Sequence, residues 1–318
     1  MQEHTKTSGG GEQIPASDST TAPQRSAMVA IIGRPSAGKS TFLNTACGEK
    51  VSIVSPVPQT TRNAIRGIVN GSRGQLVFID TPGYHESDKK LNLLLKSIAH
   101  DRLPESDAIL YLVDASREPG REEELICAML ASSSARIVVG INKIDLPDSK
   151  PGMVRLFLQK QLPLVPSDRI FEISAEKDTN IDPLLLMLFD LAPTGDPLYP
   201  KEFYTDQDVD FRISEVIREK AMLNTRDEIP HAVYVEIADL EMRKNGKELW
   251  VRAFLTVERE SQKGMLIGKG ASMIKKIRTE AVKDLNGIFP YRINLDLQVK
   301  VNKNWRQKDP VLGRLMKR

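Results

Sequence analysis

Short apolar runs alternate with amphipathic stretches through the first two-thirds of the chain. The runs rich in Val and Ile predict strands at residues 29–32, 75–79, 108–113, 137–141 and 171–173. Such runs are typical of strands buried on both faces of a parallel sheet. The stretches between them predict helices at residues 39–47, 90–100, 122–131, 153–162 and 183–191. This alternation predicts a doubly wound α/β domain with a mostly parallel sheet at residues 27–193.

The pattern changes after residues 194–210, which are rich in Pro, Asp and Tyr, show no periodicity and predict a linker. Beyond the linker, the pattern predicts a helix, two strands, a helix, a strand and a short basic helix, at 211–222, 232–238, 250–258, 272–285, 292–301 and after Asn302. This helix-first order predicts a separate α+β domain at residues 211–318.

The first 26 residues are mostly small and polar, so residues 1–26 are expected to be a disordered tail. They lack the apolar core of a secretory signal, and no apolar run is long enough to predict a membrane-spanning helix. The only two cysteines, Cys47 and Cys127, rule out a disulfide framework and favour a reducing cytoplasm.

Charge is distributed unevenly along the chain. From Asp210 onward there are 23 Lys and Arg against 15 Asp and Glu, a net of +8, although the whole chain carries only +3. A basic C-terminal part attached to an acidic N-terminal part suggests that the C-terminal part meets an anion such as RNA. A solvated basic surface is the alternative interpretation.

Residues 33–40 fit the G-x-x-x-x-G-K-[ST] pattern of a phosphate-binding loop, and they lie between a predicted strand and a predicted helix. Glycines let successive backbone N–H groups face one anion, and the helix N-terminus adds its positive dipole end. Lys39 is expected to reach the β- and γ-phosphates, and Ser40 to ligate Mg²⁺. The predicted phosphate contacts are Gly33, Arg34, Pro35, Ser36, Ala37, Gly38, Lys39 and Ser40.

A second motif, Asp80-Thr81-Pro82-Gly83, follows directly after the predicted strand at residues 75–79. The Asp80 carboxylate is expected to hold Mg²⁺ through water, and the Gly83 N–H is expected to meet the γ-phosphate. The residues assigned to the nucleotide here are Asp80, Thr81, Pro82, Gly83 and Tyr84. A hydroxyl from the preceding Gln59-Thr60-Thr61-Arg62 loop, with Thr61 favoured over Thr60, would complete the metal ligands with Ser40 and Asp80.

Asn142-Lys143-Ile144-Asp145 follows another predicted strand and indicates guanine recognition. A carboxylate accepts from guanine N1–H and the exocyclic amino group, whereas adenine would leave Asp145 unpaired at a cost of roughly 1–3 kcal/mol. Lys143 can lie along the base plane. Ser174 and Ala175 follow the last predicted strand, where a backbone N–H would face the guanine carbonyl.

Hydrolysis has weaker support than binding. The residues expected to act on the γ-phosphate are Lys39, Thr61 and Gly83. Tyr84, however, stands where a water-orienting Gln would help, and no Arg can be assigned as a finger, although Arg62 is a candidate. These features predict slow intrinsic turnover that a partner or an ion accelerates.

The predicted C-terminal domain carries a glycine-containing loop before a basic helix. Such a loop can clamp a nucleic-acid backbone as the G-x-x-G of KH modules does, although Ala271 replaces its second glycine and a plain helix-start turn is the alternative. Lysines here supply charge and isoleucines supply apolar surface for bases. The predicted RNA contacts are Ile267, Gly268, Lys269, Gly270, Ala271, Ile274, Lys275 and Lys276.

Taken together, the motifs from residue 27 onward resemble the Era family of bacterial GTPases. The most specific stretches are Pro58-Gln59-Thr60-Thr61-Arg62, Asp80-Thr81-Pro82-Gly83 and Asn142-Lys143-Ile144-Asp145. Further along the chain, Ile217-Arg218-Glu219-Lys220 precedes Glu228-Ile229-Pro230-His231, and this order is hard to find outside Era-like proteins. The resemblance implies a GTPase domain followed by a helix-first (type II) KH domain. It further implies GTP hydrolysis with Mg²⁺, binding near the 3′ end of 16S rRNA, a role in assembling the small (30S) ribosomal subunit, and a peripheral pool at the cytoplasmic membrane. We expect a monomer.

Ser36 departs from the family's pattern, which usually places Asn there. In related GTPases this Asn helps to hold a K⁺ ion that substitutes for an arginine finger, and a serine hydroxyl is a shorter ligand. Whether K⁺ activates this chain therefore stays open, as does the detail of RNA clamping at Ala271.

Three other functions share part of these sequence features. An RNA-binding scaffold with a structural nucleotide site would not depend on turnover. A tRNA-modification GTPase would share the Gln59-Thr60-Thr61-Arg62 loop, but it predicts a helical partner domain and a catalytic cysteine that the region after Asp210 does not supply. Peripheral membrane signalling needs a basic amphipathic anchor, and Pro310 and Gly313 interrupt the C-terminal tail.

Overall fold

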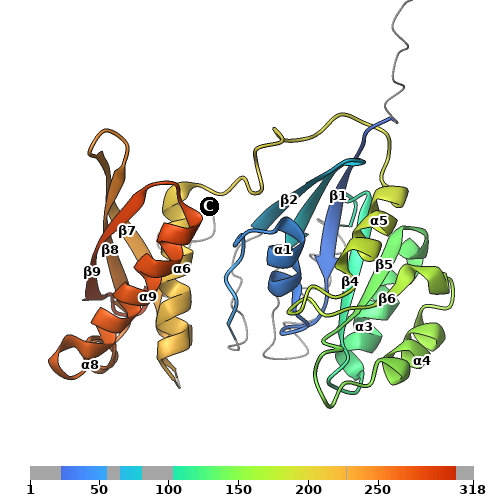
Figure 1. Cartoon of the computed structure of the whole chain (residues 1–318). Coiled ribbons are helices and arrows are strands. Elements are labelled where there is room, and N and C mark those ends of the chain that lie inside the picture. Colours follow the sequence, from blue (N-terminus) through green and yellow to red (C-terminus); the bar gives the residue numbers. More distant parts are fainter. Residues whose placement is uncertain (1–22, 56–64, 81–102, 227, 306–318) are drawn as a thin grey trace, which may run out of the picture.

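The computed structural model describes residues 23–55, 65–80, 103–226 and 228–305. The chain forms two domains that are joined by an extended segment (Figure 1). The predicted helix at 90–100 and most of the predicted N-terminal tail lie outside the described residues, as does the predicted C-terminal helix beyond Trp305.

The first domain is built on a six-stranded sheet of order β2-β3-β1-β4-β5-β6. Its strands are β1 (Arg25–Ile32), β2 (Ile65–Gly71), β3 (Gly74–Asp80), β4 (Ala108–Asp114), β5 (Ile137–Asn142) and β6 (Ile170–Glu172). Every neighbouring pair is parallel except β2 with β3. The predicted mostly parallel, doubly wound sheet is therefore confirmed.

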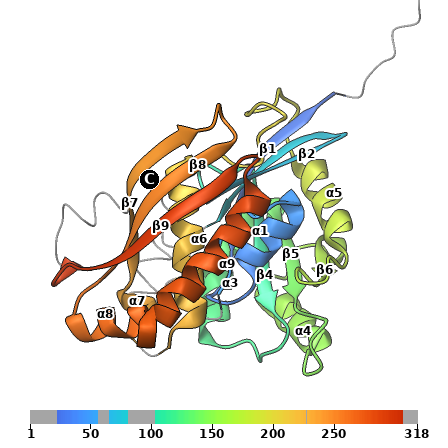
Figure 2. The same cartoon turned by 60° about the vertical axis from the view of Figure 1, so that its left-hand side comes forward.

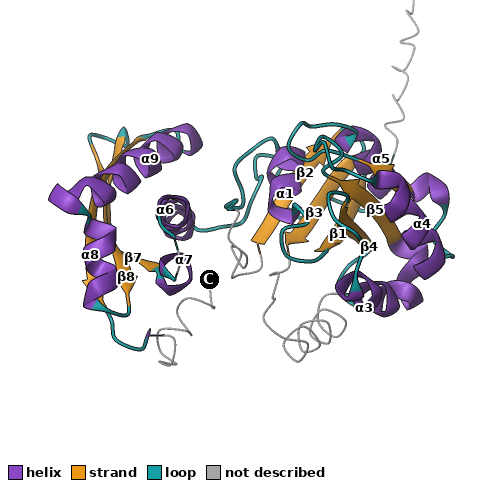
Figure 3. Ribbon diagram, turned by 90° about the horizontal axis from the view of Figure 1, so that it is seen from below, coloured by secondary structure: helices purple, strands orange, loops and turns teal. Residues whose placement is uncertain are grey.

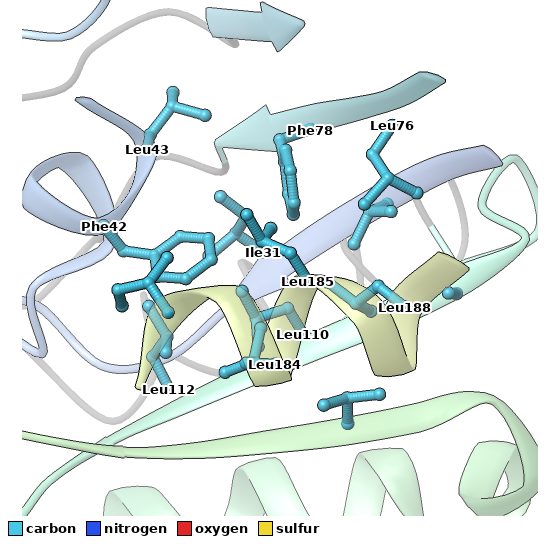
Figure 4. Packing of buried hydrophobic residues seen from close by; sticks show 14 of the residues in the cluster. Ile31, Phe42, Leu43, Leu76, Phe78, Leu110, Leu112, Leu184, Leu185 and Leu188 are labelled. Atoms are coloured by element: carbon cyan, nitrogen blue, oxygen red, sulfur yellow. The ribbon is translucent and has the colours of Figure 1, made fainter. Parts of the chain in front are cut away.

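Helices cover both faces of this sheet because successive strand residues point to opposite sides. The helices are α1 (Lys39–Cys47), α3 (Arg121–Leu130), α4 (Pro151–Gln161) and α5 (Ile181–Leu191). Phe42 of α1 and Leu184 of α5 share one buried cluster with Ile31 (Figure 4), whereas α3 and α4 pack with Ile32 in a second. These two layers of packing hold the loops at the strand ends in place.

The second domain has a three-stranded sheet of order β7-β8-β9 with helices on one face. Its elements are α6 (Val209–Asn224), α7 (Ile229–Ala232), β7 (Tyr234–Arg243), β8 (Glu248–Val257), α8 (Glu260–Ile267), α9 (Ser272–Ile288) and β9 (Arg292–Val301). Helices α6 and α9 lie on the side of this sheet that faces the first domain (Figures 1 and 2).

Several boundaries differ from the prediction. Strand β1 begins at Arg25, inside the predicted tail, because the Arg25 and Ser26 N–H groups bond to the Arg73 and Pro193 carbonyls. Helix α6 begins at Val209, two residues inside the predicted linker. The linker is also less free than its composition suggests, since Ile68 N–H donates to the Tyr204 carbonyl at 2.9 Å and Arg66 pairs with Asp206 at 2.8 Å.

Candidate functional site

The carboxyl ends of neighbouring strands bring the predicted nucleotide residues to one edge of the sheet. Asp80, Asp114 and Asn142 are the last residues of β3, β4 and β5, and the loop at residues 33–40 follows β1. In open parallel sheets ligands bind at this edge, where the strand order reverses. The alternation of strands and helices therefore assembles a site from residues that are far apart in sequence.

The loop at residues 33–40 wraps tightly between β1 and α1. Gly38 has φ +95°, and a Cβ there would lie 2.2 Å from Asn142 Nδ2. A Cβ on Gly33 would lie 2.5 Å from the Leu112 carbonyl oxygen. Ser36 also has a positive φ, +62°, and is exposed. Close approach therefore requires glycine at both positions, and backbone conformation requires it at position 38 as well.

Lys39 and Ser40 begin α1 with their side chains inside the site. Lys39 Nζ donates to the Gly33 and Arg34 carbonyls at 2.8 and 3.0 Å, and burial lowers the pKa of Lys39 while Asp80 opposes that shift. Ser40 Oγ donates to Asp80 Oδ2 at 3.1 Å. A hydroxyl beside a buried carboxylate is the hard-oxygen pair that Mg²⁺ prefers, so these residues fit the predicted metal.

Asn142 connects three loops of the site. Its Nδ2 donates to the Ala37 carbonyl at 2.9 Å, and its Oδ1 accepts the Ala175 N–H at 2.9 Å. From the same region, Thr45 Oγ1 of α1 donates to the Ala175 carbonyl at 2.7 Å. Asn142 therefore sets the spacing between the phosphate loop and the base-reading loops.

Asp145 is exposed at the rim, and the hydroxyl of Ser174 holds it. Ser174 Oγ donates to Asp145 Oδ1 at 2.6 Å and accepts the Lys177 N–H at 3.0 Å. In this structure the Ser174 N–H donates to the Thr179 carbonyl and the Ala175 N–H donates to Asn142 Oδ1, and the predicted backbone donation to guanine stays a prediction. The orienting role of the Ser174 hydroxyl was missed, and only its place after a strand hinted at it.

The loops that complete the predicted site lie outside the described residues. These are Thr61 with its neighbours Gln59, Thr60 and Arg62, and Thr81, Pro82, Gly83 and Tyr84. Their assigned roles stay predictions. Within the described part of the chain, no cluster of three or more His, Cys, Asp or Glu side chains could hold a metal ion.

The predicted RNA loop joins α8 to α9. Gly268, Gly270 and Ala271 all have positive φ, of +72°, +59° and +60°. Lys269, Lys275 and Lys276 are exposed, whereas Ile274 is half-buried against the domain core. The loop therefore presents lysine charge, whereas the Gly268 and Ala271 N–H groups are bonded to the Gly264 and Gly268 carbonyls and Ile274 is partly covered by the core.

The two domains meet through an ion-pair cluster that we call the junction: Lys50, Glu219, Lys220 and Asp284. Lys50 Nζ lies 2.5 Å from Glu219 Oε2 and 2.7 Å from Asp284 Oδ2. Lys220 Nζ lies 2.6 Å from the same Asp284 oxygen. Burial raises the pKa of Asp284, but hydrogen bonds from Lys220 and Lys50 outweigh it and hold that pKa below its usual range. Figure 3 shows α6 on the side of its domain nearest α1.

The junction also reaches toward the nucleotide. Glu219, whose side chain is 4% exposed, accepts the Val54 N–H at 2.9 Å through Oε1. Arg212 Nη2 donates to the Lys50 carbonyl at 3.3 Å. On the other side, Asn44 of α1 accepts the N–H groups of Val51 and Ser52. Helix α6 is thus bonded to the segment that leads out of the phosphate-binding helix.

Fold and site together define a P-loop GTPase that carries a C-terminal KH domain. A family model described as 50S ribosome-binding GTPase matches residues 28–143, and a KH domain model matches residues 228–306. A KH domain at this position takes the place of the helical partner domain that a tRNA-modification GTPase requires.

Close relatives extend the match over nearly the whole chain. GTPase Era of Treponema denticola is 63% identical over 290 residues, which cover 91% of this chain and 99% of that protein. GTPase Era of Borreliella afzelii is 44% identical over 292 residues, covering 92% and 99%. The chain belongs to the Era GTPase family, and it hydrolyses GTP.

Solved structures of Era agree with the fold. An Aquifex aeolicus Era variant bound to GDP·AlF₄⁻ has a TM-score of 0.81 at 32% identity, covering 91% of this chain and 98% of that one. Era in complex with MgGDPNP and nucleotides 1506–1542 of 16S ribosomal RNA matches with the same TM-score, identity and coverage. These matches confirm the order of a GTPase domain followed by a KH domain.

Proposed function

We propose that this chain is a nucleotide-gated factor in small-subunit assembly that binds 16S rRNA near its 3′ end. The observation that carries the proposal is the junction, which bonds the KH domain to the segment leaving the phosphate-binding helix. Support for the RNA comes from a relative of the same fold that was solved with a 16S rRNA fragment. Support for the contact surface comes from the exposed lysines at the α8–α9 loop.

The residues divide the work on the nucleotide. Lys39 and the backbone of residues 33–40 bind the phosphates, while Asp145, oriented by Ser174, selects guanine. Ser40 and Asp80 would hold Mg²⁺, which neutralises phosphate charge when it is bound. Thr61 would add a metal ligand, and Gly83 a backbone donor to the γ-phosphate.

The gating follows from how the domains are attached. A change in the segment after Val54 would alter the bond to Glu219, and Glu219 lies on α6 among residues that support the KH core. Ordering of the Thr60–Thr61 loop by GTP would then change how the α8–α9 loop is presented, and hydrolysis would release the RNA. Coupling of this kind between two sites typically amounts to 1–3 kcal/mol.

Intrinsic hydrolysis should be slow in the purified protein. Tyr84 cannot orient water as a Gln amide would, and the site contains no assigned arginine finger. An RNA partner or a cation is the proposed accelerator. Measurement of GTP turnover without RNA tests this directly, because a fast basal rate would show that the site needs no accelerator.

We place the protein in the cytoplasm as a monomer, with a peripheral pool at the inner membrane face as the family resemblance implies. None of the described helices is long and apolar enough to cross a membrane. Co-sedimentation of the full chain with anionic vesicles tests the peripheral pool, and failure to sediment would remove it. Light scattering of the purified chain tests the monomer.

Mapping of RNA crosslinks from the full chain in cells tests the RNA assignment. Crosslinks are expected at the 3′ end of 16S rRNA, and crosslinks concentrated on other RNAs would overturn the assembly function. A Lys275→Ala/Lys276→Ala variant should lose crosslinking and show a shallower salt dependence, since each lost phosphate contact lowers that slope by about 0.7. Lys283→Ala, on the same helix but at its other end, is the matched control.

The scaffold alternative has its own test. Lys39→Ala should abolish nucleotide binding and, if the protein is gated by GTP, should also fail to support subunit assembly. A Lys39→Ala chain that loses nucleotide but still supports assembly would favour a scaffold.

A further inference from the structure

Asp114 is a buried carboxylate in the nucleotide site that belongs to none of the recognised motifs. It is the last residue of β4 and pairs in register with Asn142 at the end of β5. Its side chain is only 1% exposed. A buried charge is costly unless it is paired and hydrogen-bonded, so its partners show what holds it there.

The partners of Asp114 fill both carboxylate oxygens. Oδ1 accepts the Ser116 N–H at 2.9 Å and the Ser116 hydroxyl at 2.5 Å. Oδ2 accepts Lys143 Nζ at 2.8 Å and lies 3.5 Å from Arg34 Nη2. Burial raises the pKa of Asp114, but the bonds from Lys143 and Ser116 outweigh it and hold that pKa below its usual range.

The two cations come from the two loops that bind opposite ends of the nucleotide. Arg34 belongs to the phosphate loop, and Lys143 belongs to the base-reading motif. Arg34 also contacts Glu123 of α3, with Nε 2.9 Å from Oε1. Glu123 is buried as well, and its Oε2 accepts the Gly120 N–H at 2.9 Å, which caps α3. The groups form a row of alternating charge, Glu123–Arg34–Asp114–Lys143, with no net charge.

We propose that Asp114 is a positioning residue that fixes the phosphate loop and the base-reading loop at the separation that a guanine nucleotide spans. By holding the ammonium of Lys143, Asp114 leaves the aliphatic stem of that lysine free to lie along the base. By holding Arg34, it ties the phosphate loop to the same carboxylate. None of these groups is expected to touch the γ-phosphate, so Asp114 should act on binding of GDP and GTP equally and not on the hydrolytic step.

Asp114→Asn tests the proposal because it keeps the shape and removes the charge. We expect the Kd values for mant-GDP and mant-GDPNP, measured with Mg²⁺, to rise by the same factor of about 10, equal to about 1.4 kcal/mol. KM for GTP should rise in step, while kcat stays within about twofold. Asp107→Asn is the matched control, because Asp107 directly precedes β4 whereas Asp114 ends it. This variant should bind both nucleotides as the native chain does.

A second set of variants keeps the test valid if Asp114→Asn folds poorly. Arg34→Met and Lys143→Met should each weaken GDP binding, and in combination they should weaken it by less than the product of their separate effects because both act through Asp114. Native GDP affinity in folded Asp114→Asn, a fall in kcat without a change in Kd, or multiplicative effects of Arg34→Met and Lys143→Met would each overturn the proposal.

Discussion

At the scale of single residues, Gly38 has no room for a side chain. An added methyl group would lie 2.2 Å from Asn142 Nδ2, and an alanine at this position would have to adopt the φ of +95° that Gly38 has. Gly38→Ala should therefore displace Asn142 from Ala37 and Ala175, weaken GDP binding at least about tenfold and destabilise the domain by about 1–3 kcal/mol. Titration with mant-GDP and urea unfolding followed by circular dichroism measure the two effects.

Gly152 provides the control for this prediction. It lies in the first turn of α4, and an added Cβ meets nothing within 4 Å. Gly152→Ala should leave GDP binding unchanged and stabilise the domain by about 0.5–1 kcal/mol. Equal behaviour of the two alanine variants would refute the steric account of the phosphate loop.

Ser36 is the residue at which the cation dependence of hydrolysis can be changed. Its φ of +62° lies in the left-handed region, which Asn tolerates better than most residues, so Ser36→Asn should be accommodated. The longer amide reaches farther than the hydroxyl, and we expect the ratio of hydrolysis rates in K⁺ and Na⁺ buffers to be larger for Ser36→Asn than for the native chain. An unchanged ratio would remove position 36 from any cation site.

Sequence motifs identified the chemistry of the nucleotide site but not the residues that orient it. The motif residues lie together because each occupies a fixed place in a motif or at the end of a strand. These residues are Gly38, Lys39, Ser40, Asp80 and Asn142. The role of the Ser174 hydroxyl and the row through Asp114 depend on side chains from different loops meeting across the sheet edge. Contacts of this kind between side chains of different loops produce no regular residue spacing that could be recognised in the sequence.

At the scale of elements, the start of α9 is strained. Ala271 precedes the helix with φ +60°, a conformation that costs a residue with a Cβ roughly 1–2 kcal/mol. Ala271→Gly should therefore raise the stability of the KH domain, by up to about 1 kcal/mol once the entropy of glycine in the unfolded chain is subtracted.

Tryptophan fluorescence isolates the stability of this domain, because both tryptophans of the chain, Trp250 and Trp305, lie in it. Urea unfolding followed by fluorescence should show a higher midpoint for Ala271→Gly and a lower one for Gly270→Ala, since Gly270 also has a positive φ. A lower midpoint for Ala271→Gly would mean that the loop is not strained at this position.

The hydrophobic pattern predicted the buried elements well and the marginal ones poorly. Helix α1 and strand β9 begin and end where predicted, because Gly38 and Gly48 bound α1 and because apolar residues alternate with polar ones along β9. Helix α8 was not predicted, because it contains Gly264 and its buried residues are only Gln262 and Leu266. The Gln262 side chain caps the start of this helix by accepting two backbone N–H groups. Strand β2 was missed because its apolar run is broken by Arg66 and Asn70, and pairing with β3 is what forms it.

At the scale of the whole molecule, the junction makes the two domains dependent on each other. Lys50→Met removes the cation that Glu219 and Asp284 share and leaves them only Lys220. This variant should bind GDP normally but show a smaller difference in RNA affinity between its GDPNP and GDP forms. Lys283→Met is the matched control. Lys283 lines the same pocket as Lys50 but is exposed, so this variant should keep the native difference.

The most direct test of nucleotide gating is the affinity of the native full chain for an RNA of the 3′-terminal nucleotides of 16S rRNA, measured at one salt concentration with saturating GDPNP or GDP. Fluorescence anisotropy of the labelled RNA is sufficient. Nucleotide gating predicts tighter binding with GDPNP, by a factor in the range of about 5–150 that is typical of coupled sites. Identical affinity in the two nucleotide states would contradict it.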